Sequence, residues 1–345
     1  MATLTETIQL LKKSSIFGVL FLIIAGLLIL VIFTNSPRSQ DQKLLPSPPP
    51  NPPIKQNPLQ SQPQIINTDR LQNIDVPGQL DTYQAIKRNI GLAEAQSLAT
   101  KLLITPTSPR VVENTQDGTL FVWNQGNQTL NLSQSNLRYT NGNIDENLLN
   151  LPETDIINIG QDFLRSLILL DPDLSLNTPK TAYLISTPVA LPQSTNSFES
   201  ANTIELHFEK KLDGISLVTN SPRSSYAILR ITKGGEVTRL DAKLFESFNK
   251  KQAFRTKTLK EAISAVSARQ GSIVEAVILD ENGQSLELFQ NLPVDLDTVS
   301  LTKVSFGYFL PDTTDDLVQP IYVFEGNFVK DNQNGRVVIY VPSLK

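Results

Sequence analysis

The chain has 345 residues, a formal net charge of -4 and a sequence pI near 5.3, so it offers no broad basic surface for a nucleic-acid backbone. It contains no cysteine, which excludes disulfides, thiolate metal sites, cysteine nucleophiles and an acylated N-terminal cysteine. A chain of this length predicts one or two domains, and the missing cysteines fit an exported protein whose stability rests on packing.

Near the N-terminus, residues 16–33 form a run of apolar residues with no charged, amide or hydroxyl side chain. As a helix, at ~1.5 Å per residue, this run covers roughly 27 Å, close to the hydrocarbon thickness of a bilayer. We expect a transmembrane helix here rather than a cleaved signal peptide, whose apolar part is usually ~7–15 residues long, or a buried core helix. Residues 1–15 then form a short cytoplasmic head, and the long C-terminal part lies outside the cytoplasm. This interpretation makes the lipid bilayer a partner of a single-pass protein in the cell membrane.

Residues 34–68 are rich in proline, including the sequence PSPPPNPP at 46–53. Proline fixes φ and removes an amide donor, so this composition favours extended polyproline II over a packed element. We therefore expect residues 34–68 to be a Pro-rich disordered linker that acts as a spacer. The ectodomain is expected to follow as a first α+β unit at 69–150 and further α+β units at 151–345.

Hydrophobic periodicity predicts three rounds of one helix followed by strands. The first round has a helix at 92–104, and strands at 120–123, 129–132 and 137–139. The second has a helix at 155–170, and strands at 181–186, 203–209, 215–219, 226–232 and 236–240. The pairs Asp213-Gly214 and Gly234-Gly235 are typical of hairpin turns between such strands.

The third round starts at Thr258 with the helical stretch TLKEAISAVSARQGS, in which Glu261 occupies the first turn. Strands are expected after it at 273–279, 286–289, 301–310, 321–328 and 336–341. The predicted fold class is therefore α+β: an N-terminal transmembrane helix, a Pro-rich linker, and an ectodomain of repeated helix-plus-antiparallel-meander units.

Several of these stretches carry a resemblance to known families. They are KTLKEAISAVSARQGSIVEAVI at 257–278, KLDGISLV at 211–218, YAILRITKGGEVTRL at 226–240, SFGYFL at 305–310 and PIYVFEGNF at 320–328. With the anchor in front, they resemble the PepSY-like families and, in layout, the YycH/YycI type of membrane-anchored extracytoplasmic regulator. The resemblance covers residues 152–341, with a weaker echo at 91–139. It implies helices packed on curled antiparallel sheets and a non-catalytic role in binding a partner in the bacterial envelope.

The only histidine, His207, shares one face of a predicted strand with Glu205 and Glu209. This spacing would allow a metal site, but a solvated strand face is the favoured interpretation. The sequence has no zinc-protease, nucleophile-elbow or phosphate-loop motif, so we expect neither an enzyme nor a cofactor.

The acidic turn with Asp312, Asp315 and Asp316 lacks the spacing of an EF-hand loop, so we expect a plain turn between strands rather than a calcium site. We expect Trp123 to be half-buried in a sheet rather than to form a sugar-stacking platform. No catalytic, cofactor-binding or metal-ligating residue is therefore assigned.

The favoured function is a non-catalytic, membrane-anchored extracytoplasmic binding or regulatory protein that acts on another envelope protein or a peptide, without nucleic acid. An extended segment of the partner would add to a sheet edge at 301–310 or 321–328, with Tyr308, Phe309 and Tyr322 as anchors. Two alternatives stay open. One is an envelope glycan hydrolase that uses paired carboxylates, and the other is a structural assembly factor of a cell-surface complex.

Overall fold

The computed structural model divides the chain into two compact units, residues 1–47 and 48–345. The structure describes part of the second unit: residues 49–54, 64–66, 71, 74–105, 109–115, 118–142, 150–167, 174–187, 192–268, 270–279, 285–288, 298–312, 317–330 and 333–345.

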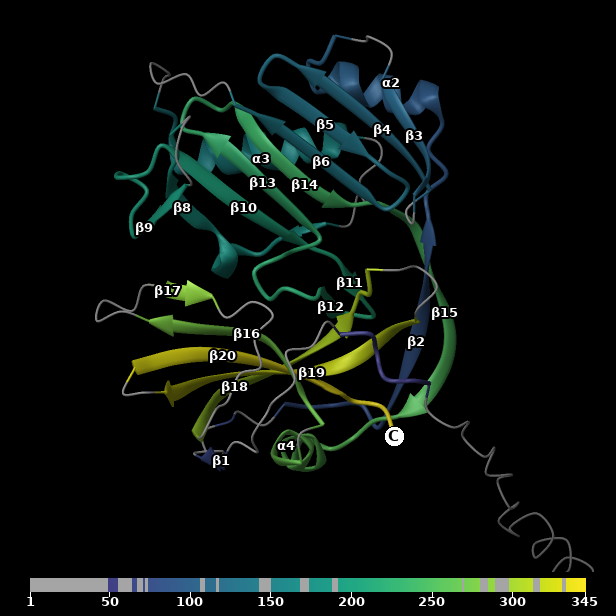
Figure 1. Ribbon diagram of the computed structural model, residues 1–345, viewed down its shortest axis with the longest axis vertical. Coiled ribbons are helices and arrows are strands. Elements are labelled where there is room, and N and C mark those ends of the chain that lie inside the picture. Colours follow the sequence, from purple (N-terminus) through teal and green to yellow (C-terminus); the bar gives the residue numbers. More distant parts are fainter. Residues whose placement is uncertain are drawn as a thin grey trace, which may run out of the picture. The chain divides into compact units, whose positions relative to one another are not determined.

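One ten-stranded sheet, called here the N-terminal sheet, is built mainly from the first two predicted rounds (Figure 1). Its strands lie in the order β3 (Arg110–Thr115), β4 (Gly118–Gln125), β5 (Gln128–Leu132), β6 (Asn136–Asn141), β14 (Val237–Lys243), β13 (Ala227–Thr232), β10 (Thr203–Glu209), β8 (Ala182–Ile185) and β9 (Gln193–Thr195). The short strand β7 (Ser175–Leu176) also pairs with β10. Every strand pair in this sheet is antiparallel.

The other ten-stranded sheet, the C-terminal sheet, has a less local topology. Its main order is β11 (Lys211–Leu212), β12 (Ile215–Val218), β18 (Thr298–Phe309), β19 (Leu317–Lys330), β20 (Gln333–Pro342), β16 (Ser272–Leu279) and β17 (Ser285–Leu288). Strand β1 (Gln64–Ile66) pairs in parallel with β18, and β2 (Gln79–Lys87) joins β19 to the long strand β15 (Phe245–Arg255).

Two helices cover one face of the N-terminal sheet: α2 (Leu92–Lys101) contacts β4, and α3 (Glu153–Ser166) contacts β10 and β13. The buried residues Ile156, Gly160 and Leu164 follow a helical spacing and turn one side of α3 to the sheet. At Gly160 a Cβ atom would lie only 2.7 Å from the side chain of Leu206, so glycine allows the close approach. The face under the helices is apolar, and the opposite face of the sheet is left for polar residues.

The helix α4 (Leu259–Ser267) packs on the C-terminal sheet against β20 and β1. It starts with a capping box, in which the side chain of Thr258 accepts a bond from the amide of Glu261 and the Glu261 carboxylate accepts one from the amide of Thr258. A short 3-10 helix, η2 (Thr178–Lys180), lies between β7 and β8.

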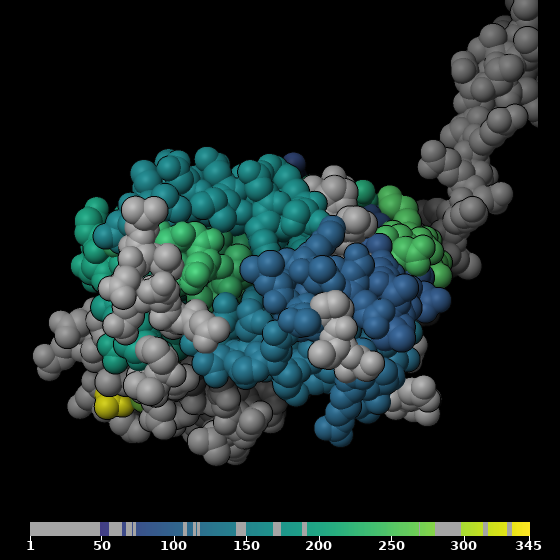
Figure 2. Space-filling model, turned by 90° about the horizontal axis from the view of Figure 1, so that it is seen from above, coloured from purple at the N-terminus to yellow at the C-terminus, as the bar shows by residue number. Residues whose placement is uncertain are grey.

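The predicted fold class is wrong. Strands predominate in the described residues, which contain three α-helices, and the predicted rounds are not repeated units. Most strands of the first two rounds share one sheet, because β6 pairs with β14 in a register that sets Tyr139 opposite Leu240, whereas β12 belongs to the C-terminal sheet. In Figure 2, the blue part of the chain lies against the teal and green parts. The division predicted at residue 150 therefore does not separate two sheets.

The expected transmembrane helix at 16–33 and the cytoplasmic head at 1–15 lie outside the described residues. None of the helices in the described residues combines the length and the hydrophobicity that a membrane span requires.

Part of the segment expected to be a disordered spacer packs against the C-terminal sheet. Ile54 is only 6% exposed and belongs to an apolar cluster with Phe309, Ile321, Val323, Val338 and Tyr340. The carbonyl oxygen of Pro50 accepts a hydrogen bond from Nε2 of the buried Gln319 at 2.9 Å. Residues 64–66 of the same segment form β1.

Most individual elements are close to their predicted positions. The three helices begin within two residues of their predicted starts, and β10 has the predicted bounds. The hairpin at Asp213-Gly214 is confirmed, with φ of 49° and 80° at these two residues, a conformation that favours glycine and aspartate.

Candidate functional site

The face of the N-terminal sheet that is turned away from α2 and α3 carries a row of mostly polar side chains. Strand register places Asn131 opposite Arg138, Arg138 opposite Asp241, Asp241 opposite Ile228, and Ile228 opposite His207. Residues in such a row project from the same face of the sheet because side chains alternate along each strand. The row therefore crosses five neighbouring strands.

Two arginines share the carboxylate of Asp241 at the centre of this row. Nε of Arg138 donates to Oδ1 at 2.8 Å, and Nε of Arg239 donates to Oδ2 at 2.5 Å. The side chain of Arg138 is 68% exposed, whereas that of Asp241 is 20% exposed. One carboxylate thus fixes the direction of two guanidinium groups and leaves one positive charge in excess.

Two pockets meet at the Arg138–Asp241 pair. The first has a volume of about 290 Å³ and extends towards β13; it is lined by Arg138, Thr219, Asn220, Ser221, Ser224, Ser225, Tyr226, Ile228, Arg239, Asp241, Ala242, Lys243 and Asp312. The second has a volume of about 400 Å³ and extends towards β4; it is lined by Thr115, Leu120, Asn131, Ser133, Asn136, Leu137, Arg138 and Asp241. Together they are called the polar groove below.

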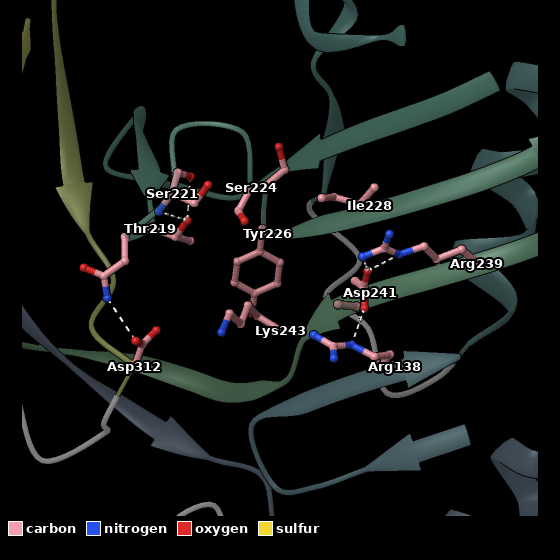
Figure 3. A pocket seen from close by; sticks show the side chains of 13 residues that line it. Arg138, Thr219, Ser221, Ser224, Tyr226, Ile228, Arg239, Asp241, Lys243 and Asp312 are labelled. Carbon is pink, nitrogen blue, oxygen red and sulfur yellow. Dashed lines mark hydrogen bonds and ion pairs between the residues drawn. The ribbon is translucent and has the colours of Figure 1, made fainter. Parts of the chain in front are cut away.

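One wall of the polar groove is the irregular segment 219–226, called the wall loop. Figure 3 shows Ser221 and Ser224 of this loop on one side of the first pocket and the arginines around Asp241 on the other, with Tyr226 and Lys243 between them. A segment without regular secondary structure needs side-chain bonds to hold a single conformation.

Side chains from several elements supply those bonds. Nζ of Lys180 donates to the carbonyl oxygens of Pro222 at 3.0 Å and Ser224 at 3.2 Å, and burial lowers the pKa of this lysine. Nδ2 of Asn220 donates to Asp312 at 3.0 Å. The wall loop is thereby fixed from η2 and from the end of β18.

Ion pairs with the buried carboxylate of Glu275 also hold the wall loop in place. Nε of Arg223 in the wall loop lies 3.1 Å from Oε2 of Glu275, which is only 4% exposed, and Nη2 of Arg336 lies 2.9 Å from Oε1 of the same carboxylate. Because Glu275 is held by two arginines, its charge is compensated inside the protein. The wall loop is therefore pre-organised before any ligand arrives.

The residues Glu205 and His207, which the sequence allowed as metal ligands, form a hydrogen-bonded network instead. Nε2 of His207 lies 3.0 Å from Oε1 of Glu205, and Nδ1 lies 3.0 Å from Oγ of Ser225 in the wall loop. Nε of Arg230 donates to Oε2 of Glu205 at 2.5 Å. His207 is 5% exposed, so the predicted solvated strand face is wrong at this position.

The pKa of Glu205 shows that this network favours the charged carboxylate. Burial acts to raise the pKa, but the bond with His207 and the charge and bond of Arg230 outweigh it and lower the pKa to about 2. Both nitrogens of His207 are engaged, and the described residues contain no group of three or more acidic or histidine side chains that fits a metal ion.

Other residues named in the sequence analysis lie in the protein core or hold the fold together. Trp123 is 2% exposed in the core beneath the helices, so it is more deeply buried than predicted. Tyr308, Phe309 and Tyr322 are fully buried, and β19 is hydrogen-bonded on both sides by β18 and β20. The predicted edge at 321–328 is therefore wrong.

The predicted acidic turn is described only in part. Asp312 accepts a hydrogen bond from Asn220, and the other two aspartates of this turn lie outside the described residues.

Sequence reasoning did not single out Arg138, Arg239 or Asp241. The alternation in VTRLDAK places Arg239 and Asp241 on one strand face, and NLRYT places Arg138 between buried neighbours. No local sequence signal indicates that these two strands pair, because Arg138 and Asp241 are 103 positions apart in the sequence.

Comparison with known proteins gives no family for this chain. No family model and no curated protein matches it. Among solved structures, an uncharacterised protein from Eubacterium rectale, known from a crystal structure at 1.45 Å, is similar with a TM-score of 0.45 and 9% sequence identity. The similarity covers 81% of this chain and 86% of that chain. The resemblance to PepSY-like and YycH/YycI-type proteins stays a prediction.

Proposed function

We propose that this protein is a non-catalytic binding protein that holds an extended segment of another protein in the polar groove. The observation that carries the proposal is the junction of the two pockets at Arg138 and Asp241. Apart from Thr115 at the end of β3, their linings extend across the sheet from Leu120 on β4 to Ile228 on β13. Five strands spaced ~4.8 Å apart span roughly 19 Å, which is the length of about six extended residues. The groove thus matches a short peptide segment better than a small metabolite.

The bonding of the acidic side chains in the groove supports binding over catalysis. Asp241 is held by two guanidinium groups, and Asp312 accepts from the amide of Asn220. A general acid or base needs a carboxylate that can exchange a proton with a substrate, whereas a carboxylate that orients arginines serves recognition. We therefore favour a binding role over the glycan hydrolase that the sequence left open.

The rigidity of the wall loop supports the same conclusion. Its bonds to Lys180, Glu275 and Asp312 are made within the protein, so the groove pays little ordering entropy when a ligand enters. The partner is expected outside the cytoplasm, as the sequence predicts, and the binding argument does not depend on that location.

Selection of peptides from a random display library on the full-length protein tests this function. The selected peptides should lose binding to Asn131→Trp, which fills the second pocket, and should keep binding to Ser97→Trp, which places the same side chain on the exposed side of α2. Peptides that bind both variants equally, or a failure to select any peptide, would contradict binding in the groove.

A further inference from the structure

The described residues that line the first pocket include more cationic than anionic side chains. Three cationic residues, Arg138, Arg239 and Lys243, line the first pocket, against two carboxylates, Asp241 and Asp312. Asp312 accepts a bond from a neutral amide at the wall loop, while Asp241 is shared by the two arginines. Nζ of Lys243 donates to the neutral Oδ1 of Asn136 at 2.9 Å. Among the described residues that line the first pocket, cationic side chains therefore outnumber carboxylates by one.

The geometry of Arg138 leaves its donors available to a ligand. A guanidinium group has five N–H donors in a planar fork, and this fork matches a carboxylate. Within the described part of the chain, the bond from Arg138 to Asp241 uses Nε alone. Its side chain is 68% exposed, and it lies where the two pockets meet.

The wall loop adds neutral donors near these cations. The hydroxyl-bearing residues Ser221 and Ser224 line the same pocket across from Arg239 (Figure 3). A pocket with arginine forks on one side and hydroxyls on the other suits an anionic oxygen group rather than an amide or a cation.

We infer that the polar groove recognises an acidic peptide segment, with a carboxylate of that segment bound at Arg138 and Arg239. This inference rests on the proposed function and adds the chemical class of the ligand. The carboxylate forms charge-assisted bonds with the free guanidinium donors of Arg138, and Asp241 positions both arginines. The backbone of the segment lies along the row of side chains from Asn131 to Ile228.

Isothermal titration calorimetry of the full-length protein with the peptides (Glu-Gly)4 and (Gln-Gly)4 tests the inference. The acidic peptide should bind at least ~10-fold more tightly than the amide peptide at low salt, since charge-assisted bonds are roughly twice as strong as neutral ones. The preference should shrink as salt is added, because the ligand carboxylate is partly exposed.

Variants of the two groove arginines and a matched control test whether the preference for the acidic peptide arises in the groove. Arg138→Gln and Arg239→Gln should each reduce it by about 10-fold or more. Arg165→Gln should leave it unchanged, because Arg165 is 69% exposed and pairs with Asp162 on α3, away from the groove. Equal stability of the three variants in thermal unfolding excludes misfolding as the cause.

The possible outcomes distinguish a failure of the acidic-ligand inference from a failure of the proposed binding function. If both peptides bind equally and both are lost in Asn131→Trp, the acidic class is wrong and binding in the groove stands. If neither peptide binds, the inference is overturned, and peptide selection then decides the function independently. If inorganic phosphate displaces (Glu-Gly)4 at an equal concentration, the pocket accepts any small anion and the assignment to an acidic peptide is also overturned.

Discussion

Replacing Glu205 by Gln should destabilise the protein at neutral pH and remove part of its sensitivity to acid. The Glu205 side chain is 16% exposed, and its pKa is lowered from 4.5 to about 2 in the folded protein. At about 1.4 kcal/mol per pKa unit, this lowering corresponds to ~3 kcal/mol of stability above pH 5. Because the folded-state pKa lies below the unfolded value, this contribution is lost as the pH falls from about 4.5 towards 2.

Urea unfolding followed by tryptophan fluorescence measures this effect directly. Trp123 is the single tryptophan and lies buried in the core of the N-terminal sheet, so it reports on the sheet that contains Glu205. At pH 7 we expect Glu205→Gln to lose ~3 kcal/mol, because Arg230, 20% exposed, is also left without its carboxylate. Glu209→Gln, four residues along the same strand, should change stability by less than ~0.5 kcal/mol. Unchanged stability of Glu205→Gln at pH 7, or an acid sensitivity equal to that of the wild type, would refute the reasoning.

Three further predictions concern glycines and the Pro-rich segment. Gly326→Ala should destabilise by ~1–3 kcal/mol in urea unfolding, since its Cβ would lie 2.6 Å from the backbone oxygen of Ser300, whereas Gly78→Ala, with open space around it, should not. Equal stabilities of these two variants would contradict the close strand contact. Gly214→Ala should cost ~1–2 kcal/mol in the same assay because φ is 80°, and a neutral effect would contradict the hairpin conformation. Ile54→Ser should speed cleavage of the Pro50–Asn51 bond by a proline-specific endopeptidase, and an unchanged cleavage rate would show that this segment does not pack on the sheet.

The positions of helices, strands and turns could be predicted because their signals are local. The alternation of Ile204, Leu206 and Phe208 defines β10, and the side chains of Thr258 and Glu261 define the start of α4. Strand β15 was missed because its middle is exposed, so the sequence FESFNKKQAFR shows no regular alternation.

The arrangement of these elements could not be predicted, because strand pairing is decided by contacts between distant segments. The sequence analysis assigns β6 and β14 to separate rounds, but the two strands pair from Asn136 opposite Lys243 to Thr140 opposite Arg239, which joins the rounds into one sheet. The same limit applies to the site. Alternation gives the face of His207 correctly, but whether that face is solvated depends on the wall loop, in which Ser225 bonds the histidine.

Site-specific photo-crosslinking of the full-length protein in its native cells tests the central claim most directly. A photoreactive residue at Asn131, inside the second pocket, is compared with one at Ser97, on the exposed side of α2. The account predicts that Asn131 captures a short segment of one partner protein, that Arg138→Gln weakens this capture, and that Ser97 does not yield it. Capture of the same proteins from both positions, or of none from Asn131, would contradict a binding function for the polar groove.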